Sequence, residues 1–246
     1  MNKLTIRLKN LVNITLFSEI LPLIFCIIFL AKIKTKALKV FFVYCILHAA
    51  FVLACTLAIY KYHSYPSYIF YLRIHLVFEY LLVTYFFYCL LKSSLVKKIL
   101  LFLIFPFLVY NVYDYILFGN EVFGNGPTLA ELLIFMAVII YYFFEKMQYY
   151  FQFPIYQTID FWIFVGLFVY SSGIFFYILL FNNSNKSDLY LINELKIIYS
   201  IVIIIKNLIL GLAFVNSNLE NAREEKVLDI PSDLNLDSFS PNTNLN

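Results

Sequence analysis

The chain consists of long apolar runs separated by short polar segments. Seven runs of about 20 residues cover Leu11 to Ala31, Val40 to Tyr60, Ile69 to Leu91, Ile99 to Phe118, Thr128 to Met147, Thr158 to Phe181 and Ile192 to Phe214. A helix of about 20 residues crosses the roughly 30 Å hydrocarbon core of a bilayer. The runs are apolar on every face, whereas the strands of a membrane barrel alternate in polarity. The pattern therefore predicts an all-α bundle of seven transmembrane helices.

A polar segment follows the last apolar run. Residues 217–246 are rich in Asn, Ser, Asp and Glu and include Pro231 and Pro241. A segment of this composition buries too little apolar surface to fold by itself. We therefore expect a seven-helix transmembrane domain over residues 1–216 and a polar, disordered cytoplasmic tail over residues 217–246.

The composition agrees with a membrane location. Of 246 residues, 63% are hydrophobic and 13% are charged, whereas about a quarter of the residues in a soluble domain are charged. We expect a multi-pass protein of the bacterial inner (plasma) membrane. The net charge of +3 resides mainly in the loops between the runs, where basic residues set topology. The lipid bilayer is therefore the expected partner, and nucleic acid is not.

The distribution of Lys and Arg predicts the orientation. Ten basic residues lie on the same side of the membrane as the loop that begins at Lys32, and six lie on the opposite side of the membrane. Basic loops favour the cytoplasm, although Lys3, Arg7 and Lys9 at the N-terminus act against this bias. We expect the N-terminus outside and the C-terminus in the cytoplasm.

Few ionisable side chains interrupt the apolar runs. Such a group in lipid costs several kcal/mol unless it is paired or meets water, so each one is a functional candidate. His48 and Lys206 lie near mid-depth, and the others lie toward the outside. We expect an outward-facing polar pocket that binds a small ligand or a proton, with Glu131 as a further candidate. Its expected ligand-binding or proton-binding residues are Glu19, His75, Glu79, Asp114 and Lys206.

Spacing suggests partners for three of these groups. His75 and Glu79 are four residues apart on one helix face, where they either share a proton or ligand or make an interhelical hydrogen bond. Lys206 lies 14 residues after Ile192 and 8 residues before Phe214, flanked by apolar residues, and cannot easily reach the interface. We predict that it contacts Glu79, directly or through a bridging water, because Glu79 lies at a similar depth. Arg73 points away from His75 and is expected to extend to the outer interface.

The sequence carries no established catalytic or cofactor motif. Histidines with the spacing of a zinc hydrolase, nucleophile elbows and phosphate-binding loops are all lacking. Lys206 in the last run invites comparison with retinal proteins, but Leu76 stands where their counter-ion would follow Arg73. The cysteines lie inside apolar runs without paired spacing, so we expect buried thiols with no disulfide or metal. We expect no cofactor.

Several short motifs carry a resemblance. They are Phe78-Glu79-Tyr80-Leu81-Leu82, Asp160-Phe161-Trp162-Ile163, Tyr170-Ser171-Ser172-Gly173 and Lys206-Asn207-Leu208. With the overall pattern, they resemble uncharacterised bacterial seven-helix membrane proteins that are similar to the sensory input halves of signalling proteins. The resemblance implies a seven-helix fold and a signalling partner in the cytoplasm or membrane, and it implies no activity.

These observations favour a sensory protein that acts on a cytoplasmic partner in trans, because the chain carries no output domain. A small transporter or channel would use the same buried residues for an ion path and remains an alternative. An intramembrane enzyme that modifies lipid is a further alternative, although we expect no enzymatic activity.

Overall fold

The computed structural model describes residues 3–61, 63–120, 123–149, 156, 158–184 and 189–228. Over these ranges the chain is helical and contains no strand. The elements are α1 (Lys3–Ile28), a short 3-10 helix η1 (Leu30–Lys32), α2 (Lys36–Tyr60), α3 (Tyr65–Leu90), α4 (Ser94–Phe118), α5 (Asn125–Tyr149), α6 (Ile159–Asn183) and α7 (Leu189–Leu228). The expected all-helical fold is confirmed over the described residues.

Six of these helices are long and apolar enough to cross a membrane, by a search restricted to the described residues. They are α2 to α7, while the apolar section of α1 is the shorter segment Asn13–Ile28. This result supports a multi-pass membrane protein and confirms six of the seven expected spans by length and composition.

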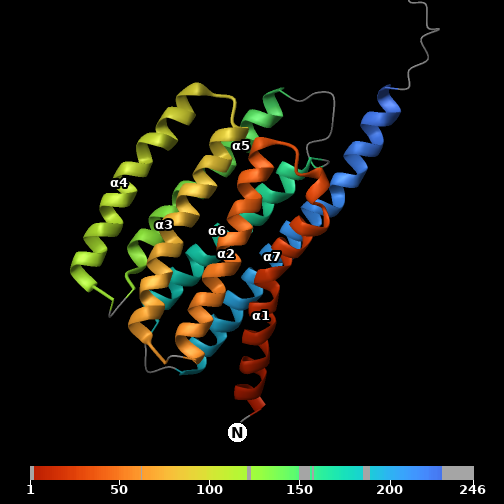
Figure 1. The fold of residues 1–246 in the computed structure, drawn as a ribbon. Coiled ribbons are helices and arrows are strands. Elements are labelled where there is room, and N and C mark those ends of the chain that lie inside the picture. The colour runs from red at the N-terminus through yellow and green to blue at the C-terminus, as the bar shows by residue number, and fades with distance from the viewer. Residues whose placement is uncertain are drawn as a thin grey trace, which may run out of the picture.

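The helices run up and down through a closed bundle (Figure 1). Each long helix packs against its neighbour in sequence, and α1 also packs extensively against α7. Helix α4 stands at the edge of the bundle (Figure 1). We call the end at which α2, α4 and α6 begin the lysine-rich end, because Lys36, Lys92, Lys97 and Lys146 lie there. The contact between α1 and α7 brings residues from opposite ends of the chain together.

Polar side chains fix where the helices begin. Thr35, Ser64, Ser93 and Thr158 each precede a helix and accept a hydrogen bond from a backbone N–H three residues further on. A cap of this kind stabilises a helix by about 1 kcal/mol. Gly119 ends α4 with a φ of +55°, a left-handed conformation that glycine adopts easily. The short connections between the helices therefore have defined end points.

Glycines allow α6 and α7 to approach each other. A Cβ atom at Gly166 would lie 2.9 Å from Leu210 Cδ2, and one at Gly173 would lie 2.6 Å from Val202 Cγ1. Small residues at such contacts favour helix association in membranes, where packing replaces the hydrophobic effect. The position of α7 against α6 therefore depends on these two glycines.

Helix α7 continues beyond its apolar section. The section that can cross a membrane is Tyr190–Val215, whereas the helix ends at Leu228. Its last turns stand apart from the other helices (Figure 1). The first part of the expected tail, residues 217–228, is thus helical, and residues 229–246 lie outside the described residues.

Candidate functional site

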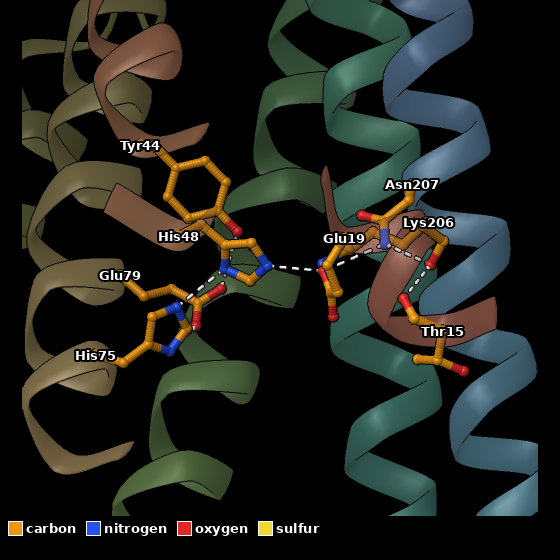
Figure 2. A network of polar contacts seen from close by, with 9 residues as sticks. Thr15, Glu19, Tyr44, His48, His75, Glu79, Lys206 and Asn207 are labelled. Carbon is orange, nitrogen blue, oxygen red and sulfur yellow. Dashed lines mark hydrogen bonds and ion pairs between the residues drawn. The ribbon is translucent and has the colours of Figure 1, made fainter. Parts of the chain in front are cut away.

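A continuous row of polar side chains crosses the interior of the bundle from α7 to α3 (Figure 2). Lys206 Nζ lies 3.2 Å from Glu19 Oε2. The same oxygen lies 2.7 Å from His48 Nε2, and His48 Nδ1 lies 2.9 Å from His75 Nε2. We call Glu19, His48, His75, Glu79 and Lys206 the central network. It links four helices, α7, α1, α2 and α3.

Glu79 forms the α3 end of the central network. Its Oε2 lies 3.6 Å from His75 Nδ1 one helical turn away, as the four-residue spacing suggested. The Tyr44 hydroxyl donates a hydrogen bond of 3.1 Å to Glu79 Oε1. Tyr44 lies one helical turn before His48 on α2. Two adjacent turns of α2 therefore contact the two turns of α3 that carry His75 and Glu79.

Glu19 is the most heavily contacted acid of the network. Its Oε2 is within hydrogen-bond distance of His48 Nε2 and Lys206 Nζ, and Asn207 Nδ2 donates to it at 3.2 Å. Asn207 Nδ2 also donates to Ser18 Oγ at 3.1 Å. Three nitrogen partners at a single oxygen fit an ionised carboxylate, because charged acceptors form the stronger hydrogen bonds.

Lys206 is enclosed within the bundle. Its side chain is 1% exposed, and its Nζ lies 4.9 Å from the centre of the Tyr170 ring on α6. A cation over an aromatic face is stabilised by the ring quadrupole. Glu19 and Tyr170 together therefore compensate the ammonium group, which has no route to water along its own side chain.

The predicted direct contact between Lys206 and Glu79 is wrong, because Lys206 pairs with Glu19. A similar expected depth does not specify which helices are neighbours. Helix α1 packs against α7, whereas α3 packs chiefly against α2. Glu79 therefore meets residues of its own helix and of α2.

Asp114 lies outside the central network and forms a second buried pair. Its Oδ2 is 2.6 Å from Arg73 Nη1, which links α4 to α3. Rings of Tyr115 and Phe123 lie 5.7 Å and 5.6 Å from the guanidinium carbon. Arg73 is 8% exposed, so the expectation that it extends to the interface is wrong. The angular spacing of residues along a helix predicted that Arg73 and His75 lie on different faces of α3. The face that carries Arg73 is covered by α4, and not by the outer interface.

Glu131 is buried on α5 and is not part of either cluster. It is 2% exposed, and its Oε1 has no hydrogen-bond partner. A buried carboxyl without a donor costs least in its neutral form. Of the candidates expected to share one pocket, Glu19, His75, Glu79 and Lys206 come together, while Asp114 and Glu131 do not join them.

A small cavity adjoins the network on the side of the lysine-rich end. Its lining includes Glu19, His48 and Lys206, together with Pro22, Tyr44, Cys45, Asn207 and Leu210. It has room for about one water molecule. The other lining residues lie within about one helical turn of the network residues on the same helices. On each helix they are displaced toward the lysine-rich end. The cavity thus lies on the side opposite to the outward-facing pocket that the sequence suggested.

The charges determine how many protons balance the network. The contacts of His48 with Glu19 and with His75, 2.7 Å and 2.9 Å long, each need one proton between their two atoms, because facing lone pairs repel. Two neutral imidazoles supply these two protons, whereas the 3.6 Å separation between His75 Nδ1 and Glu79 Oε2 is too long for a hydrogen bond. With both carboxylates ionised and Lys206 as the ammonium, the network then carries a net charge of −1. One extra proton on an imidazole brings it to neutrality.

The extra proton has two positions. If His48 holds it, both of its ring nitrogens donate, to Glu19 and to His75. If His75 holds it, His75 donates to His48 and forms an ion pair with Glu79, whose Oε2 lies 3.6 Å from His75 Nδ1. The two arrangements differ by one proton transfer across the 2.9 Å contact between the rings. The network can therefore move a positive charge from α2 to α3 without moving a heavy atom far.

Two residues that contact the central network were not recognised as site residues in the sequence, and one network residue was named without a partner. Tyr44 and Asn207 were missed, and His48 was noted only for its depth. A signal existed for each: Tyr44 precedes His48 by one turn, and Asn207 follows Lys206 as a second polar residue in an apolar run. Within the described residues, no three His, Cys, Asp or Glu side chains gather as a metal site would require.

Comparisons with protein-family models, with curated proteins and with solved structures gave no match. The central network is therefore the feature of this protein that bears on its function.

Proposed function

We propose that this protein is a sensory protein of the bacterial inner membrane and that its ligand is a proton held by the central network. The observation that carries the proposal is the direct contact of two imidazoles, His48 and His75, between two carboxylates. Histidine changes its charge near physiological pH more readily than other side chains. A row that needs one extra proton for neutrality is suited to respond when that proton leaves.

The small size of the cavity supports a proton over an organic ligand. Sites for small molecules are usually clefts of about 300–1,000 Å³, whereas the cavity beside Glu19 has room for about one water molecule. The polar atoms of the network are mostly directed at one another. A proton needs no cleft, because it binds to lone pairs that are already in contact.

The connection to α7 supports a sensory role. Loss of the proton leaves an uncompensated negative charge among buried groups, which is costly in a low-dielectric interior. The helices that carry the network would then shift to a second arrangement, as in other switches driven by buried histidine. Lys206 and Asn207 belong to α7, which continues as a helix beyond its apolar section. This extension is the proposed contact for a signalling partner in trans.

The proposed topology follows the distribution of charge. All seven helices span the membrane, the N-terminus is outside, and the lysine-rich end with the end of α7 faces the cytoplasm. The resemblance to sensory input halves of signalling proteins implies the same number of helices. The cavity beside Glu19 would then open the network toward the cytoplasmic side, so the pH of the cytoplasm is the signal that we expect it to sense.

A proton transporter is the second candidate, and Glu131 favours it. This buried carboxyl without a hydrogen-bond partner lies within two turns of the start of α5, at the end opposite the lysine-rich end. It would give a proton a stopping point between the network and the outside. A transporter predicts net proton flux, whereas a sensor needs none.

The experiment compares structure and flux in the same proteoliposomes. Hydrogen exchange of α7, corrected for the intrinsic effect of pH, reports the conformational response, and an enclosed pH dye reports flux. We expect α7 exchange to change with pH in the wild type and in His63→Gln, whose histidine lies outside the network, but not in His48→Gln or His75→Gln. Flux abolished by Glu131→Gln would favour the transporter. A wild-type α7 that does not respond to pH would overturn the sensor.

A further inference from the structure

Two lysines at the lysine-rich end lie over tyrosine rings. Lys36 Nζ on α2 is 5.3 Å from the centre of the Tyr85 ring, and Lys97 Nζ on α4 is 5.1 Å from the centre of the Tyr88 ring. The two rings are stacked, with their centres 6.1 Å apart and their planes inclined by 9°. A cation over an aromatic face is attracted by the ring quadrupole. The two ammonium groups are therefore held beside one pair of rings at the end of α3.

Helix α3 brings these side chains together because it packs against both α2 and α4 (Figure 1). Tyr85 and Tyr88 lie in its last two turns, whereas Lys36 and Lys97 lie in the first turns of α2 and α4. Both ammonium groups are also near Cys89, in the last turn of α3. We call Lys36, Tyr85, Tyr88 and Lys97 the lysine–tyrosine cluster.

The positive charge of the lysine–tyrosine cluster is not balanced by an acid. Among the described residues, neither Lys36 nor Lys97 forms an ion pair. Glu145 is buried at the same end of the bundle, but its two carboxylate oxygens accept the backbone N–H groups of Lys92 and Ser93. Helices α2 and α4 both begin at this end, where the helix dipole adds positive charge. The cluster therefore attracts an anion from outside the bundle.

The lysine–tyrosine cluster also continues into an exposed apolar face. Tyr85 is 37% exposed, and Phe78, two turns earlier on the same side of α3, is 44% exposed. In a membrane such a face meets acyl chains, whereas lysine ammonium groups and tyrosine hydroxyls lie at the level of the lipid headgroups. A ligand with a negative head and an apolar chain matches both parts.

We propose that the lysine–tyrosine cluster binds the headgroup of one anionic phospholipid. The phosphate lies between the ammonium groups of Lys36 and Lys97, and an acyl chain follows α3 from Tyr85 toward Phe78. The tyrosine rings restrict the two lysine side chains before the lipid arrives, which lowers the entropy cost of binding. Basic pockets between transmembrane helices recognise anionic headgroups on the cytoplasmic side, which this end faces in the proposed topology. The site does not depend on proton sensing by the central network.

Neighbouring lysines provide matched controls. Lys39 on α2 and Lys98 on α4 are exposed on the same helices, and within the described ranges neither lies over an aromatic ring. A general attraction between basic residues and an anionic lipid surface would involve all four lysines equally. A specific site depends on Lys36 and Lys97 alone.

Native mass spectrometry of the full-length protein measures the binding. Protein in a nonionic detergent is titrated with phosphatidylglycerol, or with phosphatidylcholine, which has the same phosphate but no net charge. We expect one phosphatidylglycerol per chain, bound at least about tenfold more tightly than phosphatidylcholine. An excess of inorganic phosphate should not displace this lipid, because phosphate alone makes no contact with the apolar face of α3.

The lysine variants test the position of the site. Lys36→Gln and Lys97→Gln should each weaken the binding of phosphatidylglycerol about fivefold, the usual effect of one lysine near an anionic lipid surface. Lys39→Gln and Lys98→Gln should change it less than about twofold, and thermal melting verifies that each variant is folded. Equal losses in all four variants, no preference for phosphatidylglycerol, or its displacement by inorganic phosphate would each overturn the proposal.

Discussion

His48 on α2 and His75 on α3 contact each other through their ring nitrogens, 2.9 Å apart, in the middle of the bundle. Each ring also has a carboxylate on its far side, Glu19 for His48 and Glu79 for His75. The pair therefore joins two acids that belong to different helices. Because the contact between the two rings needs one proton, the protonation of one ring constrains the tautomer of the other.

The shared proton between the rings should be directly observable. In protein labelled with 15N-histidine, we expect a coupling through the hydrogen bond between His48 Nδ1 and His75 Nε2. The coupling should disappear in His48→Gln and in His75→Gln, because glutamine lacks a ring nitrogen. It should persist in His63→Gln, since His63 lies outside the network. Nuclear magnetic resonance of the protein in micelles provides the measurement, and two independent imidazole signals in the wild type would contradict the geometry.

Removing the charge of Lys206 should destabilise the fold. The variant Lys206→Met leaves Glu19 without its ammonium partner, and breaking a buried pair in this way costs about 3–5 kcal/mol. The free energy of unfolding in mixed micelles gives the measurement. Lys196→Met is the control, because Lys196 is exposed on the same helix, and we expect a change within about 0.5 kcal/mol for it.

A double variant separates charge from packing at this site. Glu19→Gln together with Lys206→Met removes both members of the pair, so the network can again be neutral with one extra proton. We expect the double variant to lose about 0.5–3 kcal/mol less than the sum of the two single losses, the range of coupling between residues in contact. A loss in the double variant equal to that sum would show that Glu19 and Lys206 do not act as a pair.

The fold was largely predictable from the sequence, because an apolar run long enough to cross a membrane is expected to form a helix. The positions of the helices follow from the runs, and small shifts at their ends follow from caps such as Thr35 and Ser93. Rise per residue is fixed in a helix, and the similar depth expected for Glu79 and Lys206 agrees with their membership of one network.

The neighbours of each buried group were not predictable in the same way. Pairing depends on which helices touch and on how each is rotated, and neither is written in the hydrophobic pattern of runs that are apolar on every face. The contact of α1 with α7 decided that Lys206 meets Glu19, and the cover of α4 over α3 decided that Arg73 meets Asp114. The contact between the thiols of Cys26 and Cys45, whose sulfurs are 3.8 Å apart, has the same origin.

The pair of Arg73 and Asp114 should act separately from the central network. Asp114→Asn removes the charge that compensates a buried guanidinium, and we expect a loss of about 3–5 kcal/mol in the free energy of unfolding. The pH response of α7, measured by hydrogen exchange, should be unchanged in the folded fraction. A loss of that response with normal stability would place Asp114 in the proton-binding site after all.

The close approach of α6 and α7 predicts the effect of a single methyl group. In Gly173→Ala the new Cβ would lie 2.6 Å from Val202 Cγ1, so the helices must separate or Val202 must change its rotamer. Overpacking of this kind costs about 1–3 kcal/mol, which unfolding in mixed micelles would detect. The compensating variant Gly173→Ala with Val202→Ala removes the colliding methyl groups and should recover most of the loss. If Val202→Ala failed to restore stability, α6 and α7 would not be packed through Gly173, and the position of Lys206 on α7 would need another explanation.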